Sequence, residues 1–171
     1  EAPVDRFDTF PDDGLHQIDV AVGDGDAIVK LESIGDKIIQ FKKNNAYVIQ
    51  VSDEGVDLLH TWPHMGIGAP SQVVRAGQGF VWVNDNGLYY YDGEKVTSIS
   101  NDKFNSDTWG INEDAELPPL LAYDEVSNKV IVQTTNVSNK DNGGFVYDLA
   151  TGALSECQNL FKWYETNPDR V

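Results

Sequence analysis

The chain has little of several features that small proteins commonly use to hold a fold together or to carry chemistry. Its 171 residues include one cysteine, Cys157, so no internal disulfide can form. No apolar run approaches the roughly 18 residues of a membrane-spanning helix, and no signal peptide is visible. The single methionine, Met65, lies well inside a chain that begins Glu1-Ala2-Pro3. We therefore expect a piece of a longer polypeptide, either an excised domain or a processed product.

Basic residues are also scarce. Twelve lysines and arginines stand against 28 aspartates and glutamates, which gives a formal net charge of −16. This charge argues against general contact with nucleic acid or with an anionic membrane. It is compatible with high solubility, divalent cations or a basic partner, and the scattering of the acids among loops favours a solvated surface. A hydrophobic content of 40% still indicates a folded domain with a real core.

Helix signals are nearly absent, and a hairpin pattern occurs three times instead. The three copies run through residues 38–51, 80–91 and 130–149. Equivalent positions in successive copies lie 42 and 50 residues apart. That spacing suits a β-propeller blade or a related repeat, in which each unit buries its faces against its neighbours.

Each copy extends to four expected strands. The middle strands, such as Phe80–Val83, are continuously apolar, which suits sheets covered on both faces. We predict an all-β chain of consecutive four-stranded antiparallel units, a β-propeller or partial propeller, in a single repeat-built domain of residues 1–171. The units cover residues 27–70, 71–113 and 114–158. The expected strands are 28–33, 37–42, 46–51, 56–61, 72–76, 79–83, 88–91, 96–100, 120–123, 129–134, 144–149 and 154–157.

Turn residues recur at equivalent places in these units. Asn86-Gly87 is predicted to supply the positive φ that a two-residue hairpin turn needs. Asp92-Gly93 and Thr151-Gly152 both follow the third strand of their unit. Agreement between turn chemistry and apolar spacing supports the repeat.

The remaining segments interrupt the pattern. Residues 1–26 are turn-rich apart from one short expected strand, and residues 101–119 insert an acidic loop. Propellers have about four to eight blades, so residues 1–26 and 159–171 would be irregular or would pair as a further blade. Uncovered outer faces usually mark interfaces. The aromatic residues that we expect at such an interface are Trp109, Phe161, Trp163 and Tyr164.

Two histidines near the end of the first unit raise the question of a metal site. His60 and His64 are four residues apart, but Pro63 between them blocks a regular helix. On an extended chain they would face the same side, where a third ligand from elsewhere would complete a site. We favour a packed loop between units, which also contains Trp62 and Met65 and needs no metal.

Two acidic turns are similar in composition to calcium-binding loops. Residues 23–26 and 139–143 are rich in acidic residues, asparagine and glycine, but neither fits the register of alternating oxygen ligands, fixed glycine and terminal glutamate of such a loop. Ordinary turns are the favoured interpretation, so we expect no cofactor, with Ca²⁺ as the open alternative. Asp114 with Glu116 offers a carboxylate pair for glycoside hydrolysis, but a chain with 28 acids always offers some pair.

Motifs for nucleophilic or phosphate chemistry are missing from the sequence. No serine lies in a nucleophile-elbow motif, Cys157 has no histidine near it in sequence, and no glycine loop matches a phosphate-binding pattern. We therefore predict no enzymatic activity. Trp82 and the run Tyr89–Tyr91 would stack sugars if they lay at a ring mouth, but rings at hairpin positions are more often part of the core.

A longer succession of residues resembles a specific family. Residues 24–31 lead into 35–49, which gives a strand, a lysine-rich hairpin and a returning strand. Further matching elements follow at 68–74, 79–89, 122–124 and 146–152. The succession spans residues 24–156 and looks like blades of the propeller-bearing structural proteins of tailed bacteriophages, found among tail and neck components. Its last element also resembles Kelch-type blades.

The resemblance implies a virion part with no catalytic residues to carry over. We expect a non-enzymatic scaffold component of a phage tail or neck, located in the virion, whose partners are other protein chains of the assembly or copies of itself. Two alternatives stay open: a secreted, extracellular carbohydrate-binding or carbohydrate-active propeller, and a Kelch-like interaction module. The missing part of a ring and the insertion at 101–119 depart from the family pattern.

Overall fold

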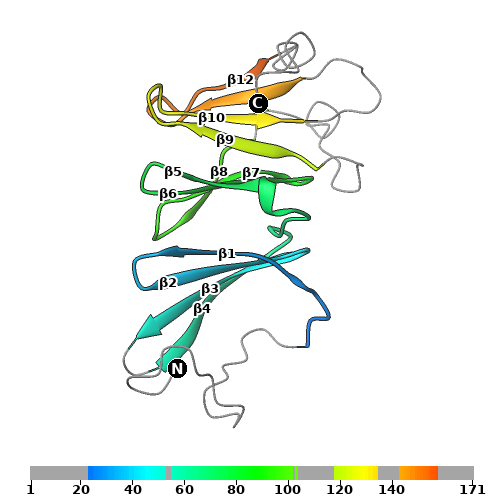
Figure 1. Ribbon diagram of the computed structural model, residues 1–171, viewed down its shortest axis with the longest axis vertical. Helices are drawn as coiled ribbons and strands as arrows, with labels where there is room; N and C mark the ends of the chain where they lie inside the picture. Colours follow the sequence, from blue (N-terminus) through cyan, green and yellow to red (C-terminus); the bar gives the residue numbers. More distant parts are fainter. Residues whose placement is uncertain (1–22, 53–54, 102, 104–117, 135–142, 158–171) are drawn as a thin grey trace, which may run out of the picture.

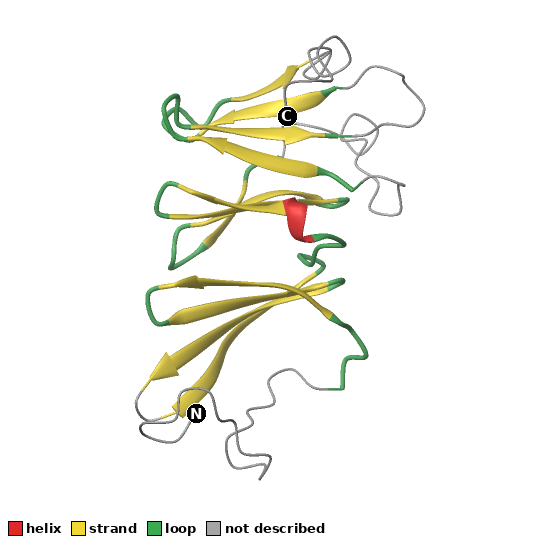
Figure 2. Cartoon of the chain, viewed as in Figure 1, coloured by secondary structure: helices red, strands yellow, loops and turns green. Residues whose placement is uncertain are grey.

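The computed structural model describes residues 23–52, 55–101, 103, 118–134 and 143–157, and within them the chain is all-β (Figures 1 and 2). Twelve strands of this described part form three four-stranded antiparallel sheets. Its one helical element is the short 3-10 turn η1 (Pro70–Gln72). None of the described residues form a helix that is long and apolar enough to cross a membrane.

Each sheet is built from strands that are consecutive in the sequence. Sheet 1 contains β1 (Ile28–Ile34), β2 (Lys37–Lys42), β3 (Asn45–Ser52) and β4 (Gly55–Pro63). Sheet 2 contains β5 (Val73–Ala76), β6 (Gly79–Asn84), β7 (Gly87–Tyr91) and β8 (Val96–Ser98). Sheet 3 contains β9 (Leu120–Asp124), β10 (Lys129–Gln133), β11 (Gly144–Asp148) and β12 (Leu154–Cys157). The prediction of consecutive four-stranded antiparallel units is confirmed, and no strand end differs from its expected position by more than two residues.

The three sheets pack face to face in sequence order (Figure 1). Sheets 1 and 2 enclose one core cluster, to which sheet 1 contributes Ile39, Phe41 and Ala46 and sheet 2 contributes Phe80, Trp82, Tyr89 and Tyr91. Sheets 2 and 3 enclose a second cluster, formed by Val81, Val83 and Leu88 with Leu121, Val130, Val132 and Phe145.

Strand β6 shows why the middle of the chain reads as continuously apolar. Successive side chains of a strand point to opposite faces, so Phe80 and Trp82 pack toward sheet 1 while Val81 and Val83 pack toward sheet 3. Every residue of β6 is buried. The expectation that the middle strands are covered on both faces is therefore confirmed for sheet 2.

The first strands of the sheets lie along one side of the molecule. The Lys30 ammonium of β1 donates to the Val73 carbonyl of β5 at 2.9 Å, and β5 in turn lies against β9. Because the strand order within each sheet follows the sequence, the chain leaves each sheet at its fourth strand and returns to the first strand of the next.

The turn between β6 and β7 differs from the prediction. Asn84 pairs with Gly87, so the two turn residues are Asp85 and Asn86, and neither Asn86 nor Gly87 has a positive φ. Instead, the Asn84 side-chain oxygen accepts hydrogen bonds from the backbone N–H groups of Asn86 and Gly87 at 2.9 and 3.1 Å. The predicted role of Asn86-Gly87 is wrong because a side-chain acceptor closes this turn. After the third strands, by contrast, Gly93 and Gly152 do have positive φ, 103° and 70°.

Candidate interaction surface

The residues that the sequence proposed for an interface are not among those that the structure describes. Trp109, Phe161, Trp163 and Tyr164 lie outside the described ranges, and so do Asp114, Glu116 and residues 139–142 of the second acidic turn. The described residues nevertheless present a surface of their own on sheet 1.

The histidine segment is organised differently from the expected loop. His60 and Trp62 belong to β4, where they pair with Val48 and Ala46 on the face that meets sheet 2. The packed connection between units begins only at His64, whose φ of 61° ends the strand. The expectation of a loop is therefore wrong for Trp62, because β4 extends two residues beyond its predicted end at residue 61, whereas His60 already lay within the expected strand 56–61. The described part of the chain brings no three His, Cys, Asp or Glu side chains close enough together to hold a metal ion.

The aromatic residues considered for sugar stacking are part of the core. Trp82 and Tyr91 are 0% and 1% exposed, and Tyr89 is also buried. Tyr90 is half-buried on the opposite face, against the cluster shared with sheet 3. A ring stacks on a sugar only when its face reaches solvent, so Trp82, Tyr89 and Tyr91 are not platforms. The interpretation of these three as core residues is confirmed.

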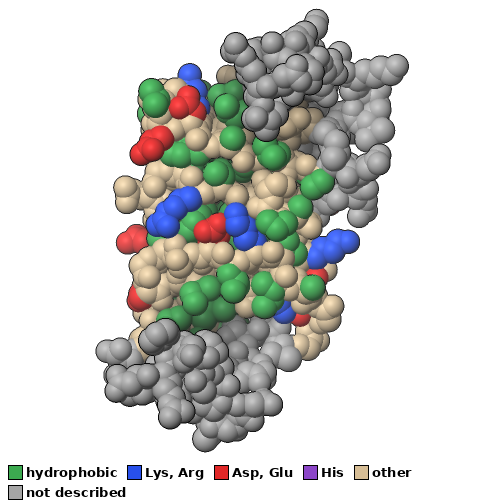
Figure 3. All heavy atoms as spheres, in the orientation of Figure 1, with side chains coloured by type: hydrophobic (Ala, Val, Ile, Leu, Met, Phe, Trp, Pro, Cys, Tyr) green, Lys and Arg blue, Asp and Glu red, His purple; other side chains and the backbone are tan. Residues whose placement is uncertain are grey.

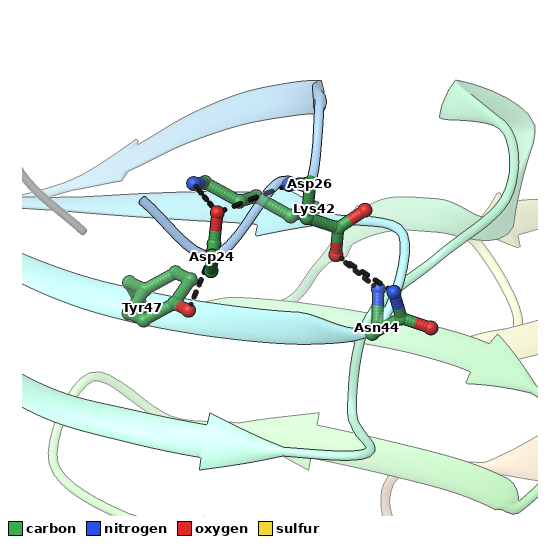
Figure 4. Close-up of polar contacts among 5 residues, drawn as sticks. All are labelled: Asp24, Asp26, Lys42, Asn44 and Tyr47. Carbon is green, nitrogen blue, oxygen red and sulfur yellow. Dashed lines mark hydrogen bonds and ion pairs between the residues drawn. The ribbon is translucent and has the colours of Figure 1, made fainter. Parts of the chain in front are cut away.

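The first acidic turn is held to the β2–β3 hairpin by an ion pair rather than shaped around a cation (Figure 4). One Asp24 carboxylate oxygen accepts from the Lys42 ammonium at 2.7 Å, and the other accepts from the Tyr47 hydroxyl at 2.7 Å. Close by, the Asp26 carboxylate accepts from the Asn44 backbone N–H at 2.7 Å. The Lys42 ammonium group therefore already supplies the counter-charge of Asp24, and a calcium ion at this carboxylate would have to displace it.

The same contacts shift two ionisation equilibria. The hydrogen bond from Lys42, followed by that from Tyr47, lowers the pKa of Asp24 from 3.8 to about 2. Burial, reinforced by the Asp24 carboxylate, raises the pKa of the Tyr47 hydroxyl. Lys42 itself is 5% exposed. The Asp24 carboxylate supplies a counter-charge for this buried side chain at 2.7 Å.

The face of sheet 1 that points away from sheet 2, here called the outer face of sheet 1, is rich in exposed aliphatic side chains. Its members alternate with the core residues along each strand and pair across the strands. Figure 3 shows hydrophobic side chains gathered on the visible side of sheet 1, the lowest of the three sheets in that view. The most exposed are Ile28 (55%), Leu31 (56%), Val51 (41%) and Leu58 (47%).

A polar side chain lies in the middle of this outer face. Gln40 pairs with Leu31 on one side and Tyr47 on the other, and it is 6% exposed. Its amide nitrogen is buried and has no hydrogen-bond partner. A buried donor without an acceptor is uncommon and costs about 1–3 kcal/mol. The outer face of sheet 1 therefore combines exposed aliphatic groups with an unsatisfied amide.

Sequence reasoning missed two polar residues that fix the connection between sheets 1 and 2. The Gln72 side-chain oxygen accepts from the backbone N–H groups of Gly68 and Ala69, and its nitrogen donates to the Val83 carbonyl. Asn84 donates to the backbone carbonyl of Gly66. For Asn84, the sequence did contain a signal of this role, because a single amide side chain ends the otherwise apolar strand β6.

No protein-family profile matches the chain, and no curated protein is significantly similar to it in sequence. The function is therefore argued from the residues and their arrangement.

Proposed function

We propose that this chain is a non-enzymatic structural component of a tailed-phage virion, in the tail or neck, built from blades of a β-propeller or partial propeller. The observation that carries the proposal is the two-sided burial of sheet 2, because a chain of mutually covering sheets is the arrangement of a scaffold. The resemblance of residues 24–156 to propeller-bearing phage structural proteins supplies the location.

The connections between sheets support the blade interpretation. In a propeller, the first strand of each blade lines the central axis, and the chain passes from the fourth strand of one blade to the first strand of the next. Here β5 lies beside both β1 and β9, and the chain enters β5 from β4 through η1. Closure of a ring would need further blades from the parent polypeptide or from a partner.

The contacts between sheets suit a load-bearing role. Core aromatic rings join sheets 1 and 2, and side-chain-to-backbone hydrogen bonds tie neighbouring units at several points. The Lys37 ammonium of sheet 1 donates to the Gly93 carbonyl of sheet 2 at 2.7 Å, and the Ser71 hydroxyl donates to the Pro119 carbonyl at 3.0 Å. Such hydrogen bonds between units resist sliding of one sheet over the next.

The proposal is tested by locating the protein in purified phage particles. Virions banded on a density gradient would be analysed by quantitative mass spectrometry, and antibody against the chain would be followed by immunogold electron microscopy. We expect a fixed copy number per particle and label on the tail or neck, with the major capsid protein as the internal standard. Recovery of the protein only in the soluble fraction of the lysate, with unlabelled virions, would overturn the proposal.

A further inference from the structure

We propose that copies of this chain associate head to tail, with the outer face of sheet 1 of one copy packed against the outer face of sheet 3 of the next. The inference goes beyond the proposed function, because it names a second copy as the partner and holds wherever the protein acts. It follows from the two outer faces that no other described sheet covers, and from the way in which the three described sheets already pack on each other.

The outer face of sheet 1 provides one half of the contact. In its described strands, the register places a single charged side chain on this face, Lys42, and Asp24 neutralises it. The other exposed groups on β1 and β4 are mostly aliphatic, among them Leu31 and Leu58. Contiguous apolar surface of this kind is uncommon on monomers and usually marks an interface.

The outer face of sheet 3 provides the other half. Leu121, Val130 and Val132 pack toward sheet 2, so the residues that alternate with them point away from it. These include Leu120, which is 44% exposed, and Ile131, which is half-buried. The face also carries acceptor oxygens, on the side chains of Gln133 and Ser155.

Continuity with the contacts inside the chain selects this pairing. Each sheet has one face directed toward the sheet that precedes it in the sequence and one directed toward the sheet that follows. Sheet 1 packs its following face on the preceding face of sheet 2, and sheet 2 packs its following face on the preceding face of sheet 3. Among the described sheets, this leaves the preceding face of sheet 1 and the following face of sheet 3, which are the two outer faces. Repeating the same packing between molecules brings sheet 3 of one copy onto sheet 1 of the next. Such a contact joins two different surfaces, so it builds a ring when the rotation closes and an open stack when it does not.

The net charge predicts how salt affects this association. Each copy carries a formal charge of −16, so copies repel one another at low ionic strength. The outer face of sheet 1 is mainly apolar, and on the outer face of sheet 3 the charged residues Asp124, Lys129 and Asp148 are neighbours of opposite sign across β9, β10 and β11. Added salt shortens the Debye length to about 8 Å at physiological ionic strength and screens the repulsion without weakening apolar packing. We expect association to tighten as salt rises, whereas an interface held by ion pairs would loosen.

Substitutions that place a carboxylate on each face test the proposal. Leu58→Glu alters the outer face of sheet 1 and Leu120→Glu that of sheet 3, at positions of similar exposure, 47% and 44%. Val126→Glu is the matched control, because Val126 is 98% exposed and lies in the turn between β9 and β10. Sedimentation velocity of the 171-residue chain would be measured over a concentration series at low and high salt, with circular dichroism to verify folding.

The head-to-tail arrangement makes a distinctive prediction for mixtures. The unaltered chain and Val126→Glu should form concentration-dependent oligomers, while each face variant alone should associate at least tenfold more weakly. An equimolar mixture of Leu58→Glu and Leu120→Glu should recover a one-to-one dimer that grows no further, because each partner still has one intact face. Recovery in the mixture also shows that both variants are folded.

Several results would overturn the inference. A monomeric unaltered chain at the highest concentration and salt would do so. Oligomers that persist in Leu120→Glu would indicate a symmetric contact between two copies of sheet 1, which contradicts head-to-tail packing. Oligomers that persist in both variants, or folded variants whose mixture stays monomeric, would likewise exclude these two faces as the contact.

Discussion

The indole ring of Trp62 stacks on the indole ring of Trp82 across the boundary between sheets 1 and 2, with ring centroids 5.6 Å apart and planes inclined by 11°. Trp82 also meets Phe41 edge-on at 5.5 Å and Tyr89 in a stacked arrangement at 5.4 Å. Its ring N–H donates to the backbone carbonyl of Met65 at 3.0 Å. One side chain thus contacts both sheets and the connection between them.

We expect Trp82→Ala to cost about 3–5 kcal/mol of the free energy of unfolding, as other large-to-small changes of buried aromatic residues do. Trp62→Ala should cost less, about 1–2 kcal/mol, because Trp62 is only half-buried. Trp62→Phe, which keeps a ring over Trp82, is the control and should be milder than Trp62→Ala. Urea unfolding followed by far-ultraviolet circular dichroism measures all three. A loss below about 1 kcal/mol in Trp82→Ala would contradict this packing.

Two glycines at the β5–β6 turn should respond very differently to the same substitution. A Cβ on Gly79 would collide with the backbone carbonyl oxygen of Tyr91, whereas a Cβ on Gly77 would meet no atom within 4 Å. Gly77 has a φ of 59°, so Gly77→Ala should cost only about 1–2 kcal/mol of left-handed strain. Gly79→Ala should cost more, because two paired strands must move apart. Equal unfolding midpoints for the two variants would argue against the β6–β7 register.

The pKa of Asp24 predicts a pH dependence of stability. Because the folded-state pKa of about 2 lies below the ordinary value of 3.8, the ionised carboxylate stabilises the fold above about pH 4. That contribution falls as the pH drops from 4 toward 2 and is gone below the folded-state pKa. Asp24→Asn should therefore unfold at lower urea than the unaltered chain at pH 7, and the difference should vanish near pH 2.

Asp26→Asn is the matched variant for this experiment. It removes a carboxylate from the same turn, one that accepts from Asn44 instead of an ammonium group. Since Asp24 and Lys42 remain in place, this variant should keep the loss of stability between pH 4 and pH 2. A pH profile of Asp24→Asn that is parallel to that of the unaltered chain would show that the ion pair does not contribute.

The architecture could be predicted from the sequence because its signals are local. Alternation and turn residues define each hairpin, and the continuous apolar run of β6 already indicates a sheet covered on both faces. The Asp24–Lys42 pair could not be predicted in this way, because 18 residues separate partners that meet only when the turn folds back over β2 and β3. The same holds for the exposed aliphatic face, since exposure depends on what covers a sheet.

The end of β4 was mispredicted for a similar reason. The register between β3 and β4 shifts between Val48 and Ile49, and this irregularity breaks the alternation that sequence reasoning follows. Trp62 then pairs with Ala46, on the face that meets sheet 2. The position of Trp62 is set by its stacking on Trp82 in sheet 2. The residue pattern of a single strand contains no information about a contact with another sheet.

The last prediction concerns Asn84, which is 2% exposed and whose amide joins a turn to a neighbouring unit. Its nitrogen donates to the carbonyls of His64 and Gly66, both at 3.0 Å, and its oxygen closes the β6–β7 turn. Asn84→Asp keeps the acceptor but sets a carboxylate oxygen against two carbonyl oxygens. We expect a loss of about 2–4 kcal/mol at neutral pH, from lost hydrogen bonds and a buried unpaired charge.

The pH dependence of Asn84→Asp separates this explanation from a simple packing defect. Burial and the facing carbonyls should raise the pKa of the introduced carboxyl in the folded state, so its protonated form, which can donate one hydrogen bond, is favoured as the pH falls. The stability deficit relative to the unaltered chain should therefore shrink between pH 7 and pH 4. Asn84→Ala, which lacks a titrating group, is the control and should keep a constant deficit over that range. A deficit in Asn84→Asp that does not change with pH would mean that the Asn84 nitrogen does not donate to His64 and Gly66.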